Sequence, residues 1–409
     1  MLVRFRQEKE QYIAYFLDTR RVIEINKIGK NILDLFFNHE KDIDSIAQSI
    51  SKKFHISLFQ ALNDVIEFLQ QIQEEIKPSG FNVLEQRQLD MPLGVEFEIT
   101  TSCNLRCKHC FQAEHQEIFV PTQKAIDTVN LLAKNGIFEV SLIGGEPLRH
   151  KGLLKIIKAC QQNQMAINLV TNLTLIDNEM LEQLAKIKRL TFLVSLDGTK
   201  KIHDKIRGKG VFRKVDKTLR ILTSKGLAVE TTFTINSINI LFYQQIIDYC
   251  RQLGIPCNFN LFKPFQPEHR NLIPEPQSFF DLIITLFNLR KNKGEKIGIS
   301  NAAIVSKLLG LPPRNECRAT RSGLVIDVNG KMITCPSLVA AGYYQDRELP
   351  AFDDHFLQKW QNHKIFNQFR NNGLRECQAR AYIFHKDVQA KDPYGITSFT
   401  KYLEKKKLQ

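Results

Sequence analysis

The chain has 409 residues, 43% of them apolar, and contains 28 phenylalanines, so it can bury a large core and is not a disordered chain. Its formal net charge is +14, but residues 1–80 hold 11 basic and 12 acidic side chains, so the basic excess lies elsewhere and identifies no partner by itself. There is no run of about 18 uncharged apolar residues and no apolar signal core at the start, which predicts a cytoplasmic protein without a membrane span.

Residues 1–80 predict a small domain made of one β-hairpin and three helices. Gln11–Leu17 and Arg21–Ile25 alternate apolar and polar side chains on either side of a three-residue turn. Apolar stripes with helical spacing follow at 27–37, 42–54 and 57–75. The third helix opens with Ser57-x-x-Gln60, which is a capping-box pattern.

A hairpin beside three helices is typical of a winged-helix domain, and DNA is one class of ligand for such domains. The third predicted helix, however, carries four acidic residues and no Lys or Arg. Acidic side chains are repelled by phosphate, so binding of nucleic acid is not expected. The simpler alternative to a ligand-binding domain is a helical domain that only supports the rest of the chain.

Strands and helices alternate after a linker at 81–94, which predicts parallel βα units in a domain over 95–265. The predicted strands are Val95–Ile99, Phe138–Ile143, Ala166–Thr171, Thr191–Leu196, Val229–Ile235 and Cys257–Phe262. The predicted helices lie near 122–135, 151–163, 177–188, 212–225 and 240–253. Parallel βα units can close into a barrel, and in such barrels the functional residues follow the carboxyl ends of the strands.

Three cysteines follow the first of these strands at the spacing C-x3-C-x2-C: Cys103, Cys107 and Cys110. In a cytoplasmic protein, clustered thiols indicate a metal site or catalysis and not a disulfide framework. Soft thiolate ligands select zinc, copper(I) or an iron–sulfur cluster, and three protein ligands leave one metal position open. A zinc knuckle or three unrelated thiols are the alternatives.

This loop, followed by the aromatic Phe111, resembles that of the radical SAM enzymes. The resemblance implies a partial (β/α)6 TIM-like barrel in which the three cysteines hold a 4Fe–4S cluster. It further implies that S-adenosylmethionine chelates the fourth iron and is cleaved to a radical that abstracts hydrogen from the substrate. Phe111 would pack on the adenine. Gly144-Gly145-Glu146-Pro147, after the second strand, matches the family's motif for the amino group of the cofactor.

Small polar residues after the third and fourth strands fall on the same rim of the predicted barrel. By the same resemblance Asn172 and Ser195 would meet the ribose or the carboxylate of the cofactor, and Arg207 could pair with that carboxylate. Helix capping by Asn172 and Ser195 and a solvated loop around Arg207 are the alternatives. Lys108 and His109, inside the cysteine loop, would face solvent or support the ligands.

The sixth strand and two helices hold the remaining residues of interest in the barrel. Asn258 and Asn260 alternate along that strand, so both could point into the barrel. Cys257 lies at its start, away from the reactive end, and is not expected to donate a hydrogen atom. Cys160 and Cys250 read as ordinary buried thiols.

After a helical bridge at 266–310, the segment 311–409 predicts a hairpin at Asn329-Gly330 that lets Cys335 approach Cys317. This pattern resembles the SPASM or twitch extension of radical SAM maturases, which holds auxiliary iron–sulfur clusters. Because only Cys377 follows, two clusters are not supported. One cluster on these three cysteines, with His385, water or a substrate thiolate as the fourth ligand, and a lid without a cluster are both open.

The N-terminal domain resembles the PqqD-like elements that bind the leader of a precursor peptide as an added strand. The whole pattern predicts a maturase of a ribosomally made peptide that forms a cross-link or thioether, or epimerises a residue, with an electron donor such as flavodoxin or ferredoxin. The alternatives are a maturase of a folded enzyme subunit and a DNA-binding iron–sulfur sensor.

Overall fold

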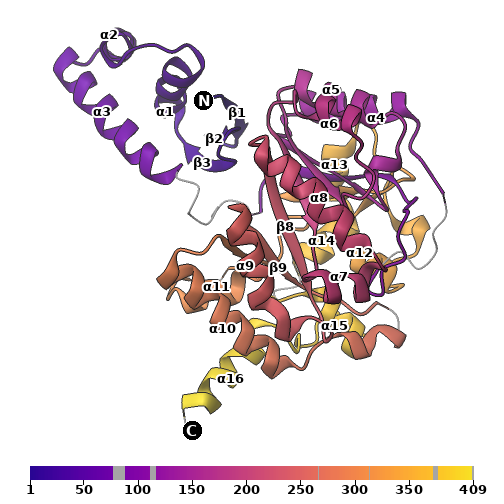
Figure 1. Ribbon diagram of the computed structural model, residues 1–409. Coiled ribbons are helices and arrows are strands. Elements are labelled where there is room, and N and C mark those ends of the chain that lie inside the picture. The colour runs from indigo at the N-terminus through magenta and orange to yellow at the C-terminus, as the bar shows by residue number, and fades with distance from the viewer. Residues whose placement is uncertain (77–87, 111–116, 266, 313, 372–375, 408–409) are drawn as a thin grey trace.

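The computed structural model describes residues 1–76, 88–110, 117–265, 267–312, 314–371 and 376–407. Figure 1 shows a small N-terminal domain beside a larger α/β body. No helix among these residues is long and apolar enough to cross a membrane.

The N-terminal domain packs three helices on an antiparallel sheet. The strands are β1 (Val3–Glu8), β2 (Gln11–Phe16) and β3 (Arg21–Ile25), in that order across the sheet. The helices are α1 (Lys27–Leu33), which continues as a π-helical turn over Asp34–Asn38, α2 (Ile43–Phe54) and α3 (Leu58–Glu75). The predicted hairpin and three helices are confirmed, and the Ser57 hydroxyl caps α3 by accepting from the Gln60 amide at 3.1 Å. The sequence does not predict β1.

The winged-helix assignment and the domain boundaries remain predictions. Part of the predicted linker, 81–94, lies outside the described residues, because the structure does not describe 77–87. Leu89 and Leu93, near its other end, are buried against Tyr15 of β2 and Phe138 of the larger body. This end of the linker is therefore packed between the two parts of the chain.

The larger body is built on six parallel strands that neighbour one another in chain order, which confirms the predicted fold. The strands are β4 (Gly94–Thr100), β5 (Glu139–Gly144), β6 (Ala166–Thr171), β7 (Leu190–Ser195), β8 (Ala228–Ile235) and β9 (Cys257–Leu261). The helices between them are α4 (Thr122–Lys134), α5 (Leu153–Gln162), α6 (Asn178–Leu184), α7 (Lys200–Arg207), α8 (Val211–Ser224) and α9 (Tyr243–Leu253). The sequence predicts all of these except α7.

Later segments add a strand or a hairpin at each edge of this sheet. β10 (Ile297–Ile299) pairs with β9, and β11 (Gly323–Ile326) pairs in parallel with β4. The turn at Asn329-Gly330, with Gly330 at a φ of +78°, returns the chain as β12 (Met332–Ile333), so the predicted hairpin is confirmed. The sequence does not predict that this hairpin lies beside β4. The pairing of β11 with β4 brings the C-terminal segment close to the first strand of the barrel.

The remaining helices cover the outside of the body. They are α10 (Pro276–Lys293), α11 (Ala302–Leu308), α12 (Pro336–Ala340), α13 (Phe356–Asn362), α14 (Lys364–Arg370), α15 (Gln378–His385) and α16 (Ile396–Lys407). Trp360, Phe356 and Phe366 are buried in the same apolar core as the barrel strands. The segment around Trp360 therefore packs the extension on the barrel.

Arg20, in the turn between β2 and β3, attaches the N-terminal domain to the larger body. Its guanidinium donates to the Ile167 carbonyl (3.1 Å) and the Thr191 hydroxyl (2.9 Å), and it also contacts Asn168 and Glu139. These partners lie at or near the starts of β5, β6 and β7. The N-terminal domain is therefore fixed at the amino ends of the parallel strands.

The two arginines of β1 strengthen this attachment. Arg6 is buried, pairs with Glu8 at 3.0 Å and donates to the Pro92 carbonyl at 2.7 Å. Arg4 donates to the Ile137 carbonyl at 3.1 Å. These polar side chains of β1 point at another part of the chain and not at solvent, which is why local alternation does not reveal the strand.

We expect Arg20→Ala to lower the free energy of unfolding by about 2 kcal/mol, because it leaves buried acceptors without their charged donor. Urea denaturation measures the change, and hydrogen exchange should show faster exchange of the β2–β3 amides. Arg213→Ala, at an exposed position of α8, is the control. Equal stability and equal β2–β3 exchange in both variants would show that Arg20 does not hold the domains together.

Candidate metal centre and cofactor cavity

The cysteine loop lies at the carboxyl end of β4, on one wall of a cavity of about 330 Å³. Cys103, Cys107 and Cys110 are half-buried and all three line this cavity. Backbone bonds shape the loop, since the Cys110 amide donates to the Cys107 carbonyl at 3.0 Å and the Leu105 amide points at the Cys103 sulfur at 3.4 Å. The structure therefore gathers the three predicted thiols in one place.

The chemistry of the thiols agrees with a bound iron–sulfur cluster. Burial raises the pKa of Cys107 to about 11 and also raises the pKa of Cys103, so both thiols keep their protons near neutral pH unless a metal displaces them. Among the described residues, no three His, Cys, Asp or Glu side chains converge as a single metal ion would need. Three thiols that line one cavity suit a cluster, in which each thiolate binds a different iron.

Two glycines let the end of β5 lie directly against the cysteine loop. A Cβ atom on Gly144 would lie 2.1 Å from the Thr100 carbonyl oxygen, and one on Gly145 would lie 2.4 Å from the Ser102 carbonyl oxygen. The Gly145 amide donates to that Thr100 oxygen at 2.8 Å. No other residue type fits at either position without moving the loop.

Glu146 ties the ends of β5 and β6 together from a fully buried position. Its carboxylate accepts from the Thr171 hydroxyl (2.7 Å), the Asn172 amide (2.6 Å) and the Leu148 amide (3.1 Å), and burial raises its pKa to about 7. Pro147 follows it in a short 3-10 turn. Because these bonds occupy the carboxylate, main-chain atoms of the motif are the groups available to a ligand.

The residues predicted after the third and fourth strands also reach this cavity. Asn172 and Ser195 line it, and the side-chain Nδ2 of Asn172 donates to Asn104 Oδ1 at 2.9 Å and lies 3.9 Å from the Cys103 sulfur. Their contacts with the cofactor remain predictions. Phe111 lies outside the described residues.

Arg207, at the end of α7, lines the cavity and is paired with a carboxylate of the chain itself. Its Nε donates to Asp197 at 2.5 Å, and its Nη1 lies 3.8 Å from the Cys107 sulfur. Burial alone would raise the pKa of Asp197, but the Arg207 guanidinium holds that pKa below its usual range. The predicted pairing of Arg207 with the cofactor remains a prediction.

His109 is the second partner of Asp197, with Nε2 3.5 Å from the carboxylate. Burial lowers the pKa of His109 to about 4, so its ring is neutral near pH 7. The side chain lines the cavity and does not face solvent. Sequence reasoning missed Asp197, although an Asp-Gly pair directly after a strand is a signal that could have singled it out.

Residues of the sixth strand divide between two cavities. Asn260 lines the cavity of the cysteine loop, whereas Asn258 lines a separate one and bonds Glu230 at 2.9 Å. The sequence predicts that both side chains point into the barrel, but only Asn260 lines the cavity of the cysteine loop. Cys257 is buried at the start of β9, and Cys250 and Cys160 are buried as expected.

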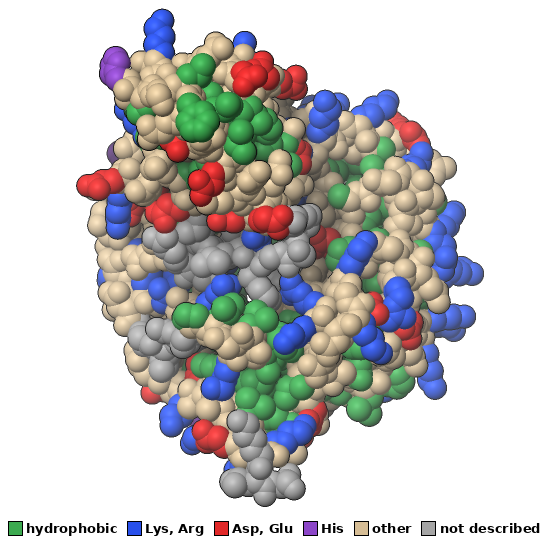
Figure 2. All heavy atoms as spheres, turned by 90° about the vertical axis from the view of Figure 1, so that its left-hand side faces the viewer, with side chains coloured by type: hydrophobic (Ala, Val, Ile, Leu, Met, Phe, Trp, Pro, Cys, Tyr) green, Lys and Arg blue, Asp and Glu red, His purple; other side chains and the backbone are tan. Residues whose placement is uncertain are grey.

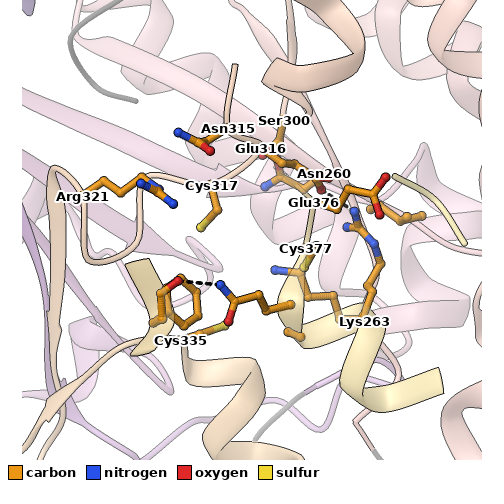
Figure 3. Close-up of a pocket in the computed structure, with 15 residues that line it drawn as sticks. Asn260, Lys263, Ser300, Asn315, Glu316, Cys317, Arg321, Cys335, Glu376 and Cys377 are labelled. Carbon is orange, nitrogen blue, oxygen red and sulfur yellow. Dashed lines mark hydrogen bonds and ion pairs between the residues drawn. The ribbon is translucent and has the colours of Figure 1, made fainter. Parts of the chain in front are cut away.

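The three C-terminal cysteines surround a second cavity, of about 200 Å³ (Figure 3). Cys335 precedes α12 and Cys377 precedes α15, and both are buried, while Cys317 is exposed on the open side. Cys335 and Cys317 thus line one cavity, and their joint role as ligands remains a prediction. His385 is exposed at the far end of α15, about 12 Å along the helix from Cys377, so the structure does not bring it to this cavity.

A buried ionic network holds the wall of the second cavity. Arg380 donates to Asp392 at 2.6 to 3.0 Å and also contacts Glu316, the neighbour of Cys317. Glu376, the neighbour of Cys377, accepts from the Asp392 amide at 3.0 Å. The network thus fixes the residues that precede Cys317 and Cys377, and sequence reasoning missed it.

Family comparisons agree with this geometry. A model of the Radical SAM superfamily matches residues 97–253, and a model of PqqD, the coenzyme PQQ synthesis protein D, matches residues 11–75. The chain is a radical SAM enzyme with a PqqD-like domain. Radical SAM enzymes use a 4Fe–4S cluster and S-adenosylmethionine, and the cysteine loop offers the thiols for such a cluster.

Curated relatives of this radical SAM enzyme include the mycofactocin maturase MftC of Mycobacterium tuberculosis, 24% identical over 70% of this chain and 74% of the relative. The subtilosin biosynthesis protein AlbA of Bacillus subtilis is 30% identical over 44% of this chain and 40% of its own length. Among solved structures, SuiB of Streptococcus suis bound to its precursor peptide SuiA has a TM-score of 0.72 at 16% identity, covering 95% of this chain and 97% of SuiB. Peptide-bound anSMEcpe has a TM-score of 0.62 at 17% identity, covering 76% of this chain and 96% of its own.

We expect Asp197→Ala to lower the free energy of unfolding by about 3–5 kcal/mol, because it leaves the Arg207 guanidinium buried without a counter-charge. Asp248→Ala, which breaks an exposed pair with Arg251, should stay near the wild-type value. Urea denaturation of the metal-free proteins measures both. Wild-type stability of Asp197→Ala would show that the pair does not hold the end of α7.

Proposed function

We propose that this radical SAM enzyme modifies a ribosomally made precursor peptide by hydrogen abstraction. The main observation behind this proposal is that one chain contains both a PqqD-like domain and a three-thiol loop. The domain lies at the amino ends of the barrel strands, and the loop lies at their carboxyl ends. Relatives named as maturases and solved structures with bound peptides support this reading. Cross-link formation, thioether formation and epimerisation all remain compatible with it.

The cysteine loop cavity is the proposed reaction site. Cys103, Cys107 and Cys110 would hold the cluster, and the main chain of Gly144-Gly145 with Asn172 and Ser195 would bind S-adenosylmethionine. When bound, these groups supply the one-electron chemistry that removes a hydrogen atom from the substrate. The protein orients the reactants and excludes water.

Asp197 keeps the charges of this cavity in place. By pairing with Arg207 it directs that guanidinium toward Cys107, and by contacting His109 it holds a neutral ring against the cavity. The His109 ring also packs edge-on against Phe262. These contacts leave a preorganised wall on which a cofactor and a peptide side chain can be positioned.

The N-terminal domain is the proposed site for the leader. Among the described residues β3 pairs with no strand other than β2, so its outer edge can accept an added peptide strand. Figure 2 shows apolar side chains gathered on the exposed face of this domain, in the upper part of the view, and its exposed apolar residues include Ile28, Leu58 and Phe59. Such a surface is typical of an interaction site.

Two alternatives are less well supported. For a DNA-binding sensor, the acidic third helix is unfavourable, since phosphate would be repelled. For a maturase of a folded enzyme subunit, a leader-binding domain has no evident use. The likeness to peptide-bound SuiB extends over 95% of the chain, N-terminal domain included, which favours a leader-guided substrate.

We also propose one auxiliary iron–sulfur cluster on Cys317, Cys335 and Cys377, with water or a substrate thiolate in the fourth position. The thiols surround one cavity, and the exposed side at Cys317 leaves room for a further ligand. The electron for the reaction would come from a small reductant such as flavodoxin or ferredoxin. A reducing, cytoplasmic location would keep the nine free cysteines reduced.

Anaerobic reconstitution with iron and sulfide tests the two proposed clusters. We expect about eight irons per wild-type chain, about four in the Cys103→Ala/Cys107→Ala/Cys110→Ala variant, and 5′-deoxyadenosine only from the wild type after reduction. About four irons falling to none in the variant would show that the extension is a lid without a cluster. No 5′-deoxyadenosine, even with added precursor peptide, would exclude the proposed chemistry.

Hydrogen exchange on the full chain tests the leader site. Short peptides encoded beside the gene serve as probes, each with a scrambled version as the control. A true precursor should slow exchange of the β3 amides and of α3, because an added strand bonds the open edge of β3. Protection confined to other parts of the chain would place the peptide elsewhere.

A further inference from the structure

Lys263 lies in the wall between the two cavities. It follows β9 by two residues, at the carboxyl end of the barrel strands, and its side chain lines both the cysteine loop cavity and the second cavity. In Figure 3 it points from the wall into the space around which Cys317, Cys335 and Cys377 lie. One half-buried ammonium group therefore faces all three thiols of the extension.

Other cations along these cavities already have partners within the protein. Arg207 is paired with Asp197, and Arg380 with Asp392 and Glu316. Arg321 donates to the Arg370 carbonyl at 2.9 Å. Lys263, in contrast, makes no hydrogen bond or ion pair with any residue that the structure describes.

An ammonium group withdrawn from water costs free energy unless negative charge lies near it. The thiols are the groups around Lys263 that can supply this charge. Iron binds cysteine as the thiolate, so a centre bound to Cys317, Cys335 and Cys377 would bring negative charge into the cavity that Lys263 lines.

We propose that Lys263 is the counter-charge of the metal centre on Cys317, Cys335 and Cys377 and raises the reduction potential of that centre. This inference rests on the auxiliary cluster of the proposed function. Net charge close to an iron–sulfur cluster is one of the determinants of its potential, and a cation stabilises the reduced, more negative form. Lys263 also lines the cysteine loop cavity, so a substitution of Lys263 alters both cavities.

The test removes the first cluster and varies only Lys263. In the Cys103→Ala/Cys107→Ala/Cys110→Ala background all bound iron belongs to the extension, so its midpoint potential can be read by a redox titration followed by electron paramagnetic resonance. The variants are Lys263→Met, which removes the charge at similar length, and Lys263→Arg, which keeps it. Lys188→Met, at an exposed position, is the control.

We expect Lys263→Met to shift the midpoint potential to a more negative value, while Lys263→Arg and Lys188→Met stay at the value of the parent. Loss of iron from Lys263→Met with full iron in Lys263→Arg would also support the proposal, because those variants differ in charge. An unchanged potential in Lys263→Met, or equal loss of iron from both Lys263 variants, would overturn it. Absence of iron from the parent itself would instead refute the auxiliary cluster, and with it the role of Lys263.

Discussion

Close contact between the main chains at the ends of β4 and β5 is the constraint on which the reaction cavity depends. The Thr100 and Ser102 carbonyls meet Gly144 and Gly145 so closely that a single Cβ atom would collide with them. The cysteine loop is thereby placed by backbone hydrogen bonds, and side chains need only face the cavity. Glu146 extends the same restraint to the end of β6 through bonds to Thr171 and Asn172. A rigid support of this kind positions ligands better than a free loop would.

Charge in the buried part of the enzyme is arranged in small, closed groups. Asp197 serves Arg207 and His109 at the first cavity, and Asp392 and Glu316 serve Arg380 at the second. Because each arginine in these groups has at least one carboxylate beside it, the cost of removing the charges from water is largely offset. Lys263 has neither a carboxylate nor a carbonyl partner among the described residues, which is why it points to negative charge that a bound centre would bring.

The two ends of the barrel have separate tasks. Arg20 fixes the N-terminal domain where the parallel strands begin, whereas both cavities lie where the strands end. A strand of six residues spans about 20 Å, so a peptide held by the domain must cover at least that distance to reach the reaction site. Under the proposed function, this separation lets one leader-binding surface serve core peptides of different sequence.

Local pattern in the sequence determined the six parallel strands, the N-terminal hairpin and helices, the cysteine loop and the turn at Asn329-Gly330. Each of these follows from periodicity, caps or spacing within a short window, which side-chain direction and turn geometry impose on the chain by themselves. Only the tertiary structure decided that β11 lies beside β4, that Asp197 binds Arg207 and His109, and that Lys263 stands between the cavities. It also placed His385, one of the three candidates for a fourth ligand, away from the cysteines. These relations join residues far apart along the chain, and their free energy comes from burial and charge pairing that exist only once the barrel has closed around them.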